Sequence, residues 1–178
     1  VIRIEVIEAP GMTPAMVGLL RRLADAAYDG GFTDDDLRHA LGGTHVVARE
    51  RGLWLAHAAV VPRSILIGER RVRAGFVEAV AVRPEQQGRG LGTRVMAMIA
   101  TIIAERYDIG VLSTGDHEFY ERFGWEEWHG PSWVIGADGV LRRTEDEDDG
   151  LMVLRCAATR DIDTTLAIAC HDRPGDAW

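Results

Sequence analysis

The chain has 178 residues, of which 47% are hydrophobic and 27% are charged. These are ordinary values for a globular protein, and the length suits one domain, residues 1–178, with a sizeable core. The formal net charge of −8 excludes nucleic acid and anionic membranes from the expected partners and favours cationic ligands.

Neither the cysteines nor the histidines suggest a metal site. Cys156 and Cys170 form no CxxC pair, and His57, His117 and His129 are too scattered for a ligand set, so we expect no metal ion. The first residues lack the charged and then apolar pattern of a signal peptide, and no apolar run reaches the length of a membrane span. A reducing cytoplasm is therefore the expected compartment.

The first part of the chain predicts one strand and two helices. Loose alternation of apolar residues indicates a strand over residues 1–8. Thr13-Pro14 is typical of a helix N-cap followed by the first helical position, and this helix ends at Asp29-Gly30-Gly31. Thr33 begins a second, short helix, which Gly42-Gly43 closes.

The remainder predicts a strand meander, then helix–strand alternation, then two extended segments. The predicted elements are strands at 44–49, 53–67 and 70–83, a helix at about 91–106, a buried strand at 109–113, a helix at about 115–123, and extended segments at 125–135 and 150–158 separated by an acidic loop. These two extended segments are expected to form the final hairpin. This order predicts a mixed central sheet flanked by helices, in the α/β (α+β) class.

A basic, glycine-rich turn follows the third strand of the meander. Its residues are Gln87-Gly88-Arg89-Gly90-Leu91-Gly92. Glycines let successive N–H groups converge at the positive end of the helix dipole, so the turn predicts an anion site. A tight strand-to-helix turn is the alternative. A P-loop is excluded because no Lys-Ser/Thr pair follows the last glycine, and a dinucleotide fingerprint is excluded because Val95 stands at its third glycine.

Glu78 lies in the apolar strand that leads to this turn. A carboxylate there is costly unless it faces water or has a chemical role, and both alternatives stay open from the strand pattern alone. Its position at the end of that strand would allow it to take a proton from a substrate ammonium, directly or through a water molecule.

Tyr120 lies in the segment Phe119-Tyr120-Glu121-Arg122-Phe123-Gly124-Trp125. An aromatic residue at this spacing is more commonly part of a core than a catalyst. The alternative is a chemical role for the phenol, which can donate a proton.

Three groups of acidic residues could bind a cation. They are Asp34–Asp36 after Thr33, the run Glu145–Asp149, and Asp176 near Trp178. Helix capping, a solvated loop and a frayed end are the respective alternatives. A terminal tryptophan suggests a packed end, which would place an α-carboxylate beside Asp176.

These features resemble a known superfamily. The spacing Gln87-x-x-Gly90-x-Gly92 resembles the pyrophosphate loop of GNAT acetyltransferases, and nearly the whole chain resembles their aminoglycoside 2′-N-acetyltransferase branch. The motifs that carry the closer resemblance are Phe32-Thr33 with Asp36, Leu41-Gly42-Gly43-x-His45, Ala56-His57-Ala58-Ala59-Val60, Val77-Glu78-x-Val80-Ala81-Val82-Arg83, Gly124-Trp125-x-x-Trp128-His129-Gly130-Pro131, Asp148-Asp149-Gly150 and Gly175-Asp176-x-Trp178.

The resemblance implies a GNAT fold, acetyl-CoA as the donor with coenzyme A as product, a cationic aminoglycoside as acceptor, and a homodimer. For the donor it implies pantetheine bonds along Val80, Ala81 and Val82, and pyrophosphate binding by Gln87, Gly88, Arg89, Gly90, Leu91 and Gly92. It implies Glu78 and the carboxylate of Trp178 as candidate bases and Tyr120 as the acid. The residues implied for antibiotic binding are Asp36, Glu78, Ser113, Asp148, Asp176 and Trp178.

Two departures from the family pattern suggest a shifted substrate range. Gly31 stands where relatives carry an aspartate before Phe-Thr, and the segment from Ser113 to Tyr120 is two residues shorter than in relatives. We therefore predict an antibiotic with fewer ammonium groups, such as kasugamycin. The alternatives are acetylation of another amine (a polyamine, an amino sugar or a protein N-terminus) and a non-catalytic coenzyme-A-binding module.

Overall fold

The computed structural model describes residues 1–178, which pack as two compact units. The first unit comprises Val1–Val61 and Val77–Thr101, and the second comprises Pro62–Phe76 and Ile102–Trp178. Strands β3 (Leu53–Ile67) and β4 (Arg70–Val82) and helix α3 (Leu91–Arg106) contribute to both. Ten strands form a mixed sheet with flanking helices, which confirms the predicted fold class.

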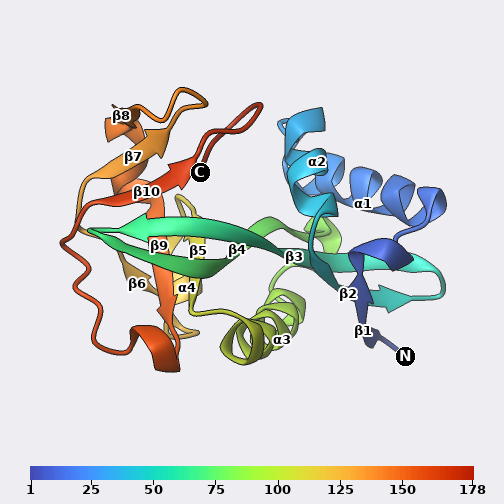
Figure 1. The fold of residues 1–178 in the computed structure, drawn as a ribbon. Helices are drawn as coiled ribbons and strands as arrows, with labels where there is room; N and C mark the ends of the chain where they lie inside the picture. Colours follow the sequence, from blue (N-terminus) through green and yellow to red (C-terminus); the bar gives the residue numbers. More distant parts are fainter. The chain divides into compact units, whose positions relative to one another are not determined.

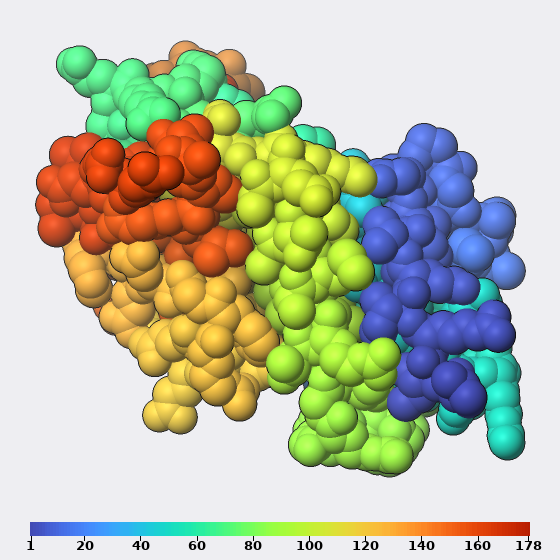
Figure 2. All heavy atoms as spheres, turned by 90° about the horizontal axis from the view of Figure 1, so that it is seen from below, coloured from blue at the N-terminus to red at the C-terminus, as the bar shows by residue number.

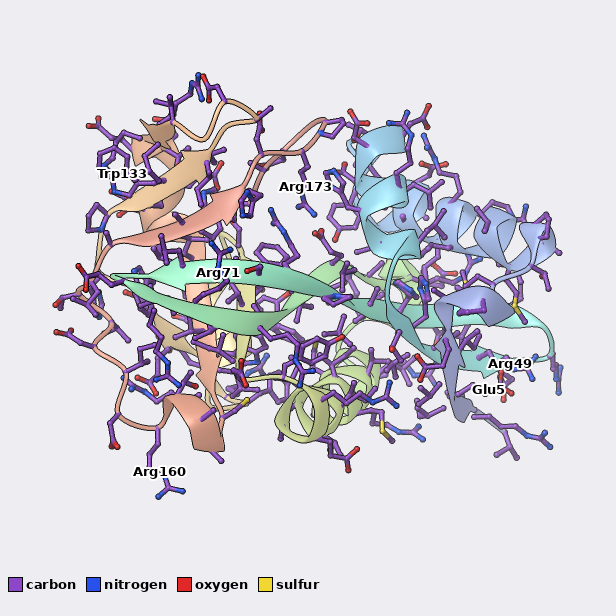
Figure 3. The ribbon with its side chains drawn as sticks, viewed as in Figure 1. Glu5, Arg49, Arg71, Trp133, Arg160 and Arg173 are labelled. Atoms are coloured by element: carbon purple, nitrogen blue, oxygen red, sulfur yellow. The ribbon has the colours of Figure 1, made fainter.

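The first unit is built on an antiparallel arrangement of strands. β1 (Arg3–Glu8) pairs with β2 (Thr44–Glu50), and β2 pairs with the first part of β3. Figure 2 shows the dark-blue atoms of the first residues beside the cyan atoms of the β2–β3 turn, as this pairing requires. Figure 3 labels Glu5 and Arg49, whose ion pair joins β1 to β2.

Two helices of this unit begin at the predicted caps. The Thr13 hydroxyl accepts a bond from the Met16 amide at the start of α1 (Pro14–Ala27). Thr33 and Asp36 form a reciprocal capping box at the start of α2 (Asp34–Leu41). The buried face of α1 packs Leu20 and Leu23 against residues of β2, β3 and β4, which places the helices next to the strands (Figure 1).

The second unit contains the rest of the sheet. β5 (Ile109–Ser113) runs parallel to β4 from Ala74 to Phe76, and β9 (Leu151–Arg155) runs antiparallel to β5. β10 (Ile168–His171) lies between β3 and β7 (Ser132–Ile135), antiparallel to the former and parallel to the latter. The edge strands are β6 (Glu126–Glu127), which pairs with β9, and β8 (Leu141–Arg143), which pairs with β7.

Several predicted elements in this unit differ from the structure. The helix expected at about 115–123 is α4 (His117–Glu121), shortened because the Asp116 carboxylate caps it through the Phe119 amide. The expected acidic loop is a 3-10 turn at Glu145–Gly150. The predicted closing hairpin was only partly right, because Glu126–Glu127 pair with β9 whereas β7 joins β8 and β10. None of the helices is both long and apolar enough to cross a membrane.

Candidate active site

In the first unit, strand β4 changes its backbone conformation beside Glu78. Ala79 has φ +52°, in the left-handed region that non-glycine residues rarely adopt. Backbone strain of this kind tends to occur at functional sites, where the surrounding structure holds it. The strained residue lies between Glu78 and Val80. The family resemblance implies Glu78 as a candidate base and Val80 as the first backbone contact to the acetyl donor.

Tyr28, at the end of α1, lies against the same segment. Its hydroxyl donates to the Val80 carbonyl at 2.8 Å. Desolvation of the hydroxyl, followed by the negative charges of Asp36 and Glu78, raises the pKa of Tyr28 to about 12, although the residue as a whole is 42% exposed. The phenol therefore stays protonated at neutral pH and keeps its bond to β4. Asp36, Glu78 and Val80 thus gather around a tyrosine that the sequence analysis did not identify.

The carboxylate of Asp36 has a structural role as well. It accepts bonds from the amide and the hydroxyl of Thr33, at 2.7 and 2.8 Å, within the capping box of α2. A carboxylate at this position favourably faces the helix dipole.

The glycine-rich turn leads directly into α3. Gly88 and Gly90 have φ +71° and +75°, and a Cβ added at either would meet no atom within 4 Å. The Arg89 guanidinium donates to the Gln86 side chain at 2.7 Å. Amides in the first turn of α3 have no intrahelical acceptor. Open glycine backbone, a guanidinium and a helix N-terminus together form an arrangement that fits a phosphate group.

In the second unit, Tyr120 is 8% exposed and packs edge-on against Phe119 and Trp125. Its ring therefore belongs to the aromatic core of this unit, as the spacing of the segment predicts. Burial of the ring does not oppose a chemical role of the hydroxyl, since a general acid needs a dry surrounding to hold its proton until the reaction.

A second group of acidic and hydroxyl side chains lies at the end of β5. The Ser113 hydroxyl donates to the Glu147 carboxylate at 3.3 Å. Burial, and then the negative charge of Asp176, raises the pKa of Glu147. Two carboxylates and a hydroxyl therefore lie close together, an arrangement that a ligand ammonium would neutralise. The sequence analysis named Ser113 and Asp176 individually, and it named Glu147 only as a member of the acidic run Glu145–Asp149 that could bind a cation.

Asp148 has a different environment from Glu147. Its carboxylate forms an ion pair with Arg143 and accepts bonds from the amide and the hydroxyl of Ser132, both at 2.8 Å. The bond from Arg143 is the main reason that the pKa of Asp148 falls to about 2. The side chain is thus firmly held within the protein.

Trp178 packs into the core of the second unit and is 4% exposed. Its indole Nε1 donates to the Thr144 hydroxyl at 3.2 Å, and Ser132 bonds to the same hydroxyl at 2.8 Å. Its amide donates to the Asp176 carboxylate at 3.1 Å. Arg173, labelled in Figure 3, donates to the Asp176 carbonyl from the loop after β10. Asp148, through Ser132 and Thr144, is therefore connected to the tryptophan.

The sheet, the glycine-rich turn and the flanking helices define an acetyltransferase fold, and the chain belongs to the GNAT acetyltransferase family. The family model described as an acetyltransferase (GNAT) domain matches residues 24–128. An aminoglycoside 2′-N-acetyltransferase from Mycolicibacterium fortuitum is 43% identical over 162 residues, which cover 89% of this chain and 83% of the relative.

Solved structures show the same fold. The GNAT family N-acetyltransferase YhbS from Escherichia coli, in complex with CoA, has a TM-score of 0.68 and 19% identity over 98% of this chain and 93% of its own. A GNAT family acetyltransferase from Brucella melitensis, in complex with acetyl-CoA, has a TM-score of 0.54 and 26% identity over 70% of this chain and 83% of its own. Eis1 from Mycobacterium abscessus is longer, and this chain covers 33% of it, with a TM-score of 0.62, 20% identity and 75% of this chain aligned.

Proposed function

We propose that this chain transfers the acetyl group of acetyl-CoA to the 2′-amino group of an aminoglycoside antibiotic and thereby confers resistance. The observation that carries the proposal is the 43% identity with an aminoglycoside 2′-N-acetyltransferase over 89% of the chain. The partly buried carboxylates of the second unit support it, because they suit a ligand that carries several ammonium groups.

Acetyl-CoA, when bound, supplies an activated acetyl group as a thioester. The residues Gln87 to Gly92 would hold its pyrophosphate, since the turn combines open glycine backbone with Arg89 and the start of α3. The backbone of Val80, Ala81 and Val82 would bond to the pantetheine arm as a strand edge bonds to an extended peptide.

In the proposed reaction, Glu78 takes a proton from the acceptor ammonium, through a water molecule, and the free amine forms the new C–N bond at the thioester carbonyl. Backbone amides near Val80 stabilise the negative charge that develops on the carbonyl oxygen. The C–S bond then breaks, Tyr120 protonates the departing thiolate, and the second proton released by the nitrogen restores the phenol. The second candidate for the base is the α-carboxylate of Trp178, a group that exists only if Trp178 is the C-terminal residue.

The antibiotic's ammonium and hydroxyl groups would bind to Asp36, Glu78, Ser113, Asp148 and Asp176. The missing aspartate at Gly31 favours a substrate with fewer ammonium groups, such as kasugamycin. Gly31 does not have a positive φ, but a Cβ at this position would lie 3.1 Å from the Tyr28 carbonyl oxygen, so an aspartate here would require a small backbone shift.

Free-thiol release from acetyl-CoA across a panel of amines tests the proposal. The panel contains kasugamycin, gentamicin, tobramycin, an aminoglycoside with a 2′-hydroxyl group, and spermidine. We expect turnover with 2′-amino compounds and none with the 2′-hydroxyl compound. Expression in a susceptible bacterium should raise the inhibitory concentration of the same compounds. Turnover of spermidine alone would refute the assigned acceptor, and faster turnover of gentamicin than of kasugamycin would refute the predicted substrate range.

A further inference from the structure

Two buried histidines of the first unit lie against the strained segment of β4. His45 and His57 are both fully buried, on the neighbouring strands β2 and β3. Buried polar side chains need hydrogen-bond partners, and a pair inside an otherwise apolar sheet is costly without a role. The mechanism proposed above assigns no role to either ring.

The hydrogen bonds of the pair fix the protons on both rings. His57 Nδ1 lies 2.8 Å from the Ala79 carbonyl oxygen, and since a carbonyl only accepts, Nδ1 carries the proton. In the neutral ring, Nε2 of His57 is then an acceptor, so His45 Nδ1, at 2.9 Å, must donate to it. His45 Nε2 is left without a proton, and it is a buried atom without a hydrogen-bond partner.

Both rings stay neutral at physiological pH, as this chain of bonds requires. Burial is the main cause that lowers the pKa of His45 to about 4 and that of His57 to about 3. Glu8 acts in the opposite direction on His45, and the Trp54 ring stacks on His57 with ring centroids 5.8 Å apart. The donor toward Ala79 is therefore present over the whole neutral range.

The bond from His57 controls the direction of a backbone amide. The Ala79 carbonyl and the Val80 N–H belong to one peptide group, and no peptide bond in the chain is cis. In a trans peptide the C=O and N–H bonds point in opposite directions, so a donor that holds the Ala79 oxygen also aims the Val80 N–H. Tyr28 holds the next carbonyl, that of Val80, at 2.8 Å. Side chains thus hold both peptide groups that follow the strained residue.

We propose that His45 and His57 are positioning residues, which hold the Ala79–Val80 peptide group in the strained conformation that aims the Val80 amide at the thioester oxygen. This inference rests on the proposed acetyl transfer. The pair touches no reacting atom: His57 acts through the backbone of β4, and His45 acts by donating a hydrogen bond to Nε2 of His57, which holds that ring in place.

The test compares three variants with the wild-type protein. His57→Leu removes the donor at nearly constant size, whereas His57→Asn retains an N–H near the position of Nδ1. Val47→Ala is the matched control, because Val47 is a fully buried residue paired opposite His57, and its truncation weakens the same sheet without removing the bond to Ala79. Thermal unfolding confirms that each variant is folded before its kinetics are measured.

We expect His57→Leu to lower kcat by up to about a hundredfold, the cost of misplacing a catalytic group by about 1 Å. KM of His57→Leu for the aminoglycoside should stay unchanged. The variants His57→Asn and Val47→Ala should retain most of the wild-type kcat. Wild-type kcat in a folded His57→Leu protein, or an equal loss in Val47→Ala, would overturn the positioning role.

Two NMR measurements test the inference independently of the antibiotic. The Val80 amide resonance should shift in His57→Leu and remain close to its wild-type position in His57→Asn, and unchanged spectra in both would overturn the proposal. In His45→Phe, the ¹⁵N shift of His57 Nε2 should change because this atom loses its hydrogen-bond donor, and an unchanged Nε2 shift would remove His45 from the proposal. If the wild-type protein acetylates no aminoglycoside, the proposed function fails while these spectra still decide the role of the pair.

Discussion

At the scale of single residues, adjacent acidic side chains differ in how they are bound. Asp148 accepts hydrogen bonds from Arg143 and Ser132. Glu147, by contrast, accepts one bond from the Ser113 hydroxyl and is repelled by the negative charge of Asp176. A carboxylate that already has a cationic partner contributes less to ligand binding than a carboxylate that is repelled by a neighbouring negative charge. The two residues are therefore expected to respond differently to loss of charge.

Asp148→Asn should lower the free energy of unfolding by about 1–3 kcal/mol, because Arg143 loses its partner. Glu147→Gln should leave stability nearly unchanged and raise KM for a polycationic aminoglycoside several-fold. Urea denaturation and steady-state kinetics on both variants measure these effects. A larger rise of KM in a stable Asp148→Asn protein than in Glu147→Gln would contradict the assignment.

Tyr120 allows a test of the proton donor. Tyr120→Phe removes one oxygen from a side chain that is 8% exposed and leaves its aromatic contacts in place. If Tyr120 is the acid, kcat should fall by about a hundredfold, a typical contribution of general acid catalysis. The dissociation constant of the antibiotic, measured by calorimetry, should stay the same. Unchanged turnover would remove Tyr120 from the acid role.

At the scale of elements, the Trp-His-Gly-Pro segment is a structural junction. Trp128 Nε1 donates to the Leu166 carbonyl at 3.0 Å, and the amides of His129 and Gly130 donate to the Thr164 carbonyl at 2.9 Å each. A Cβ at Gly130 would lie 1.8 Å from the Leu166 oxygen, closer than atoms can approach. The motif therefore joins the segment before β7 to the segment before β10.

Gly130→Ala should destabilise the protein by about 1–3 kcal/mol, the usual cost of overpacking. Gly115→Ala is the control, because a Cβ there meets no atom within 4 Å and the residue has no positive φ. This control should change the free energy of unfolding by no more than about 0.5 kcal/mol. Equal stabilities of the two variants in urea denaturation would contradict the role of the Trp-His-Gly-Pro segment as a structural junction.

The histidines of β2 and β3 give the first unit a pH-dependent stability. The pKa values of His45 and His57, about 4 and about 3, lie below the ordinary value of 6.5. The unfolded chain therefore binds protons that the folded chain does not, and stability falls as the pH drops below 6.5. At pH 5 each histidine should cost about 2 kcal/mol.

The variant His57→Asn isolates this effect. His117 acts in the opposite direction, because its bond to Glu127 raises its pKa, but it is common to both proteins. The loss of stability between pH 7 and pH 5, measured by urea denaturation, should therefore be smaller in His57→Asn by about 2 kcal/mol. An equal loss in both proteins would mean that His57 is protonated in the folded state.

The sequence predicted those elements that depend on residues close together in the chain. Thr13-Pro14, the Thr33 capping box and the glycine-rich turn each act through residues a few positions apart, and each lies where it was expected. Contacts between distant residues carry no such signal. Tyr28 reaches Val80 and Glu147 reaches Ser113 across long stretches of chain. Strand β10 was missed for the same reason, since its pairing with β3 and β7 depends on tertiary contacts.

At the scale of the whole molecule, the net charge of −8 should attract cationic acceptors. Such attraction acts over roughly 10 Å at 0.1 M salt and is screened at higher ionic strength. KM for an aminoglycoside should therefore rise with salt while kcat stays constant. The rise of KM with salt should be steeper for gentamicin than for kasugamycin, because gentamicin carries more ammonium groups. Steady-state kinetics between about 0.05 and 0.5 M NaCl measure both slopes, because the Debye length falls from above about 10 Å to below it across this range. Equal slopes would mean that short-range hydrogen bonds to the sugar, and not the acidic field of the protein, determine acceptor binding.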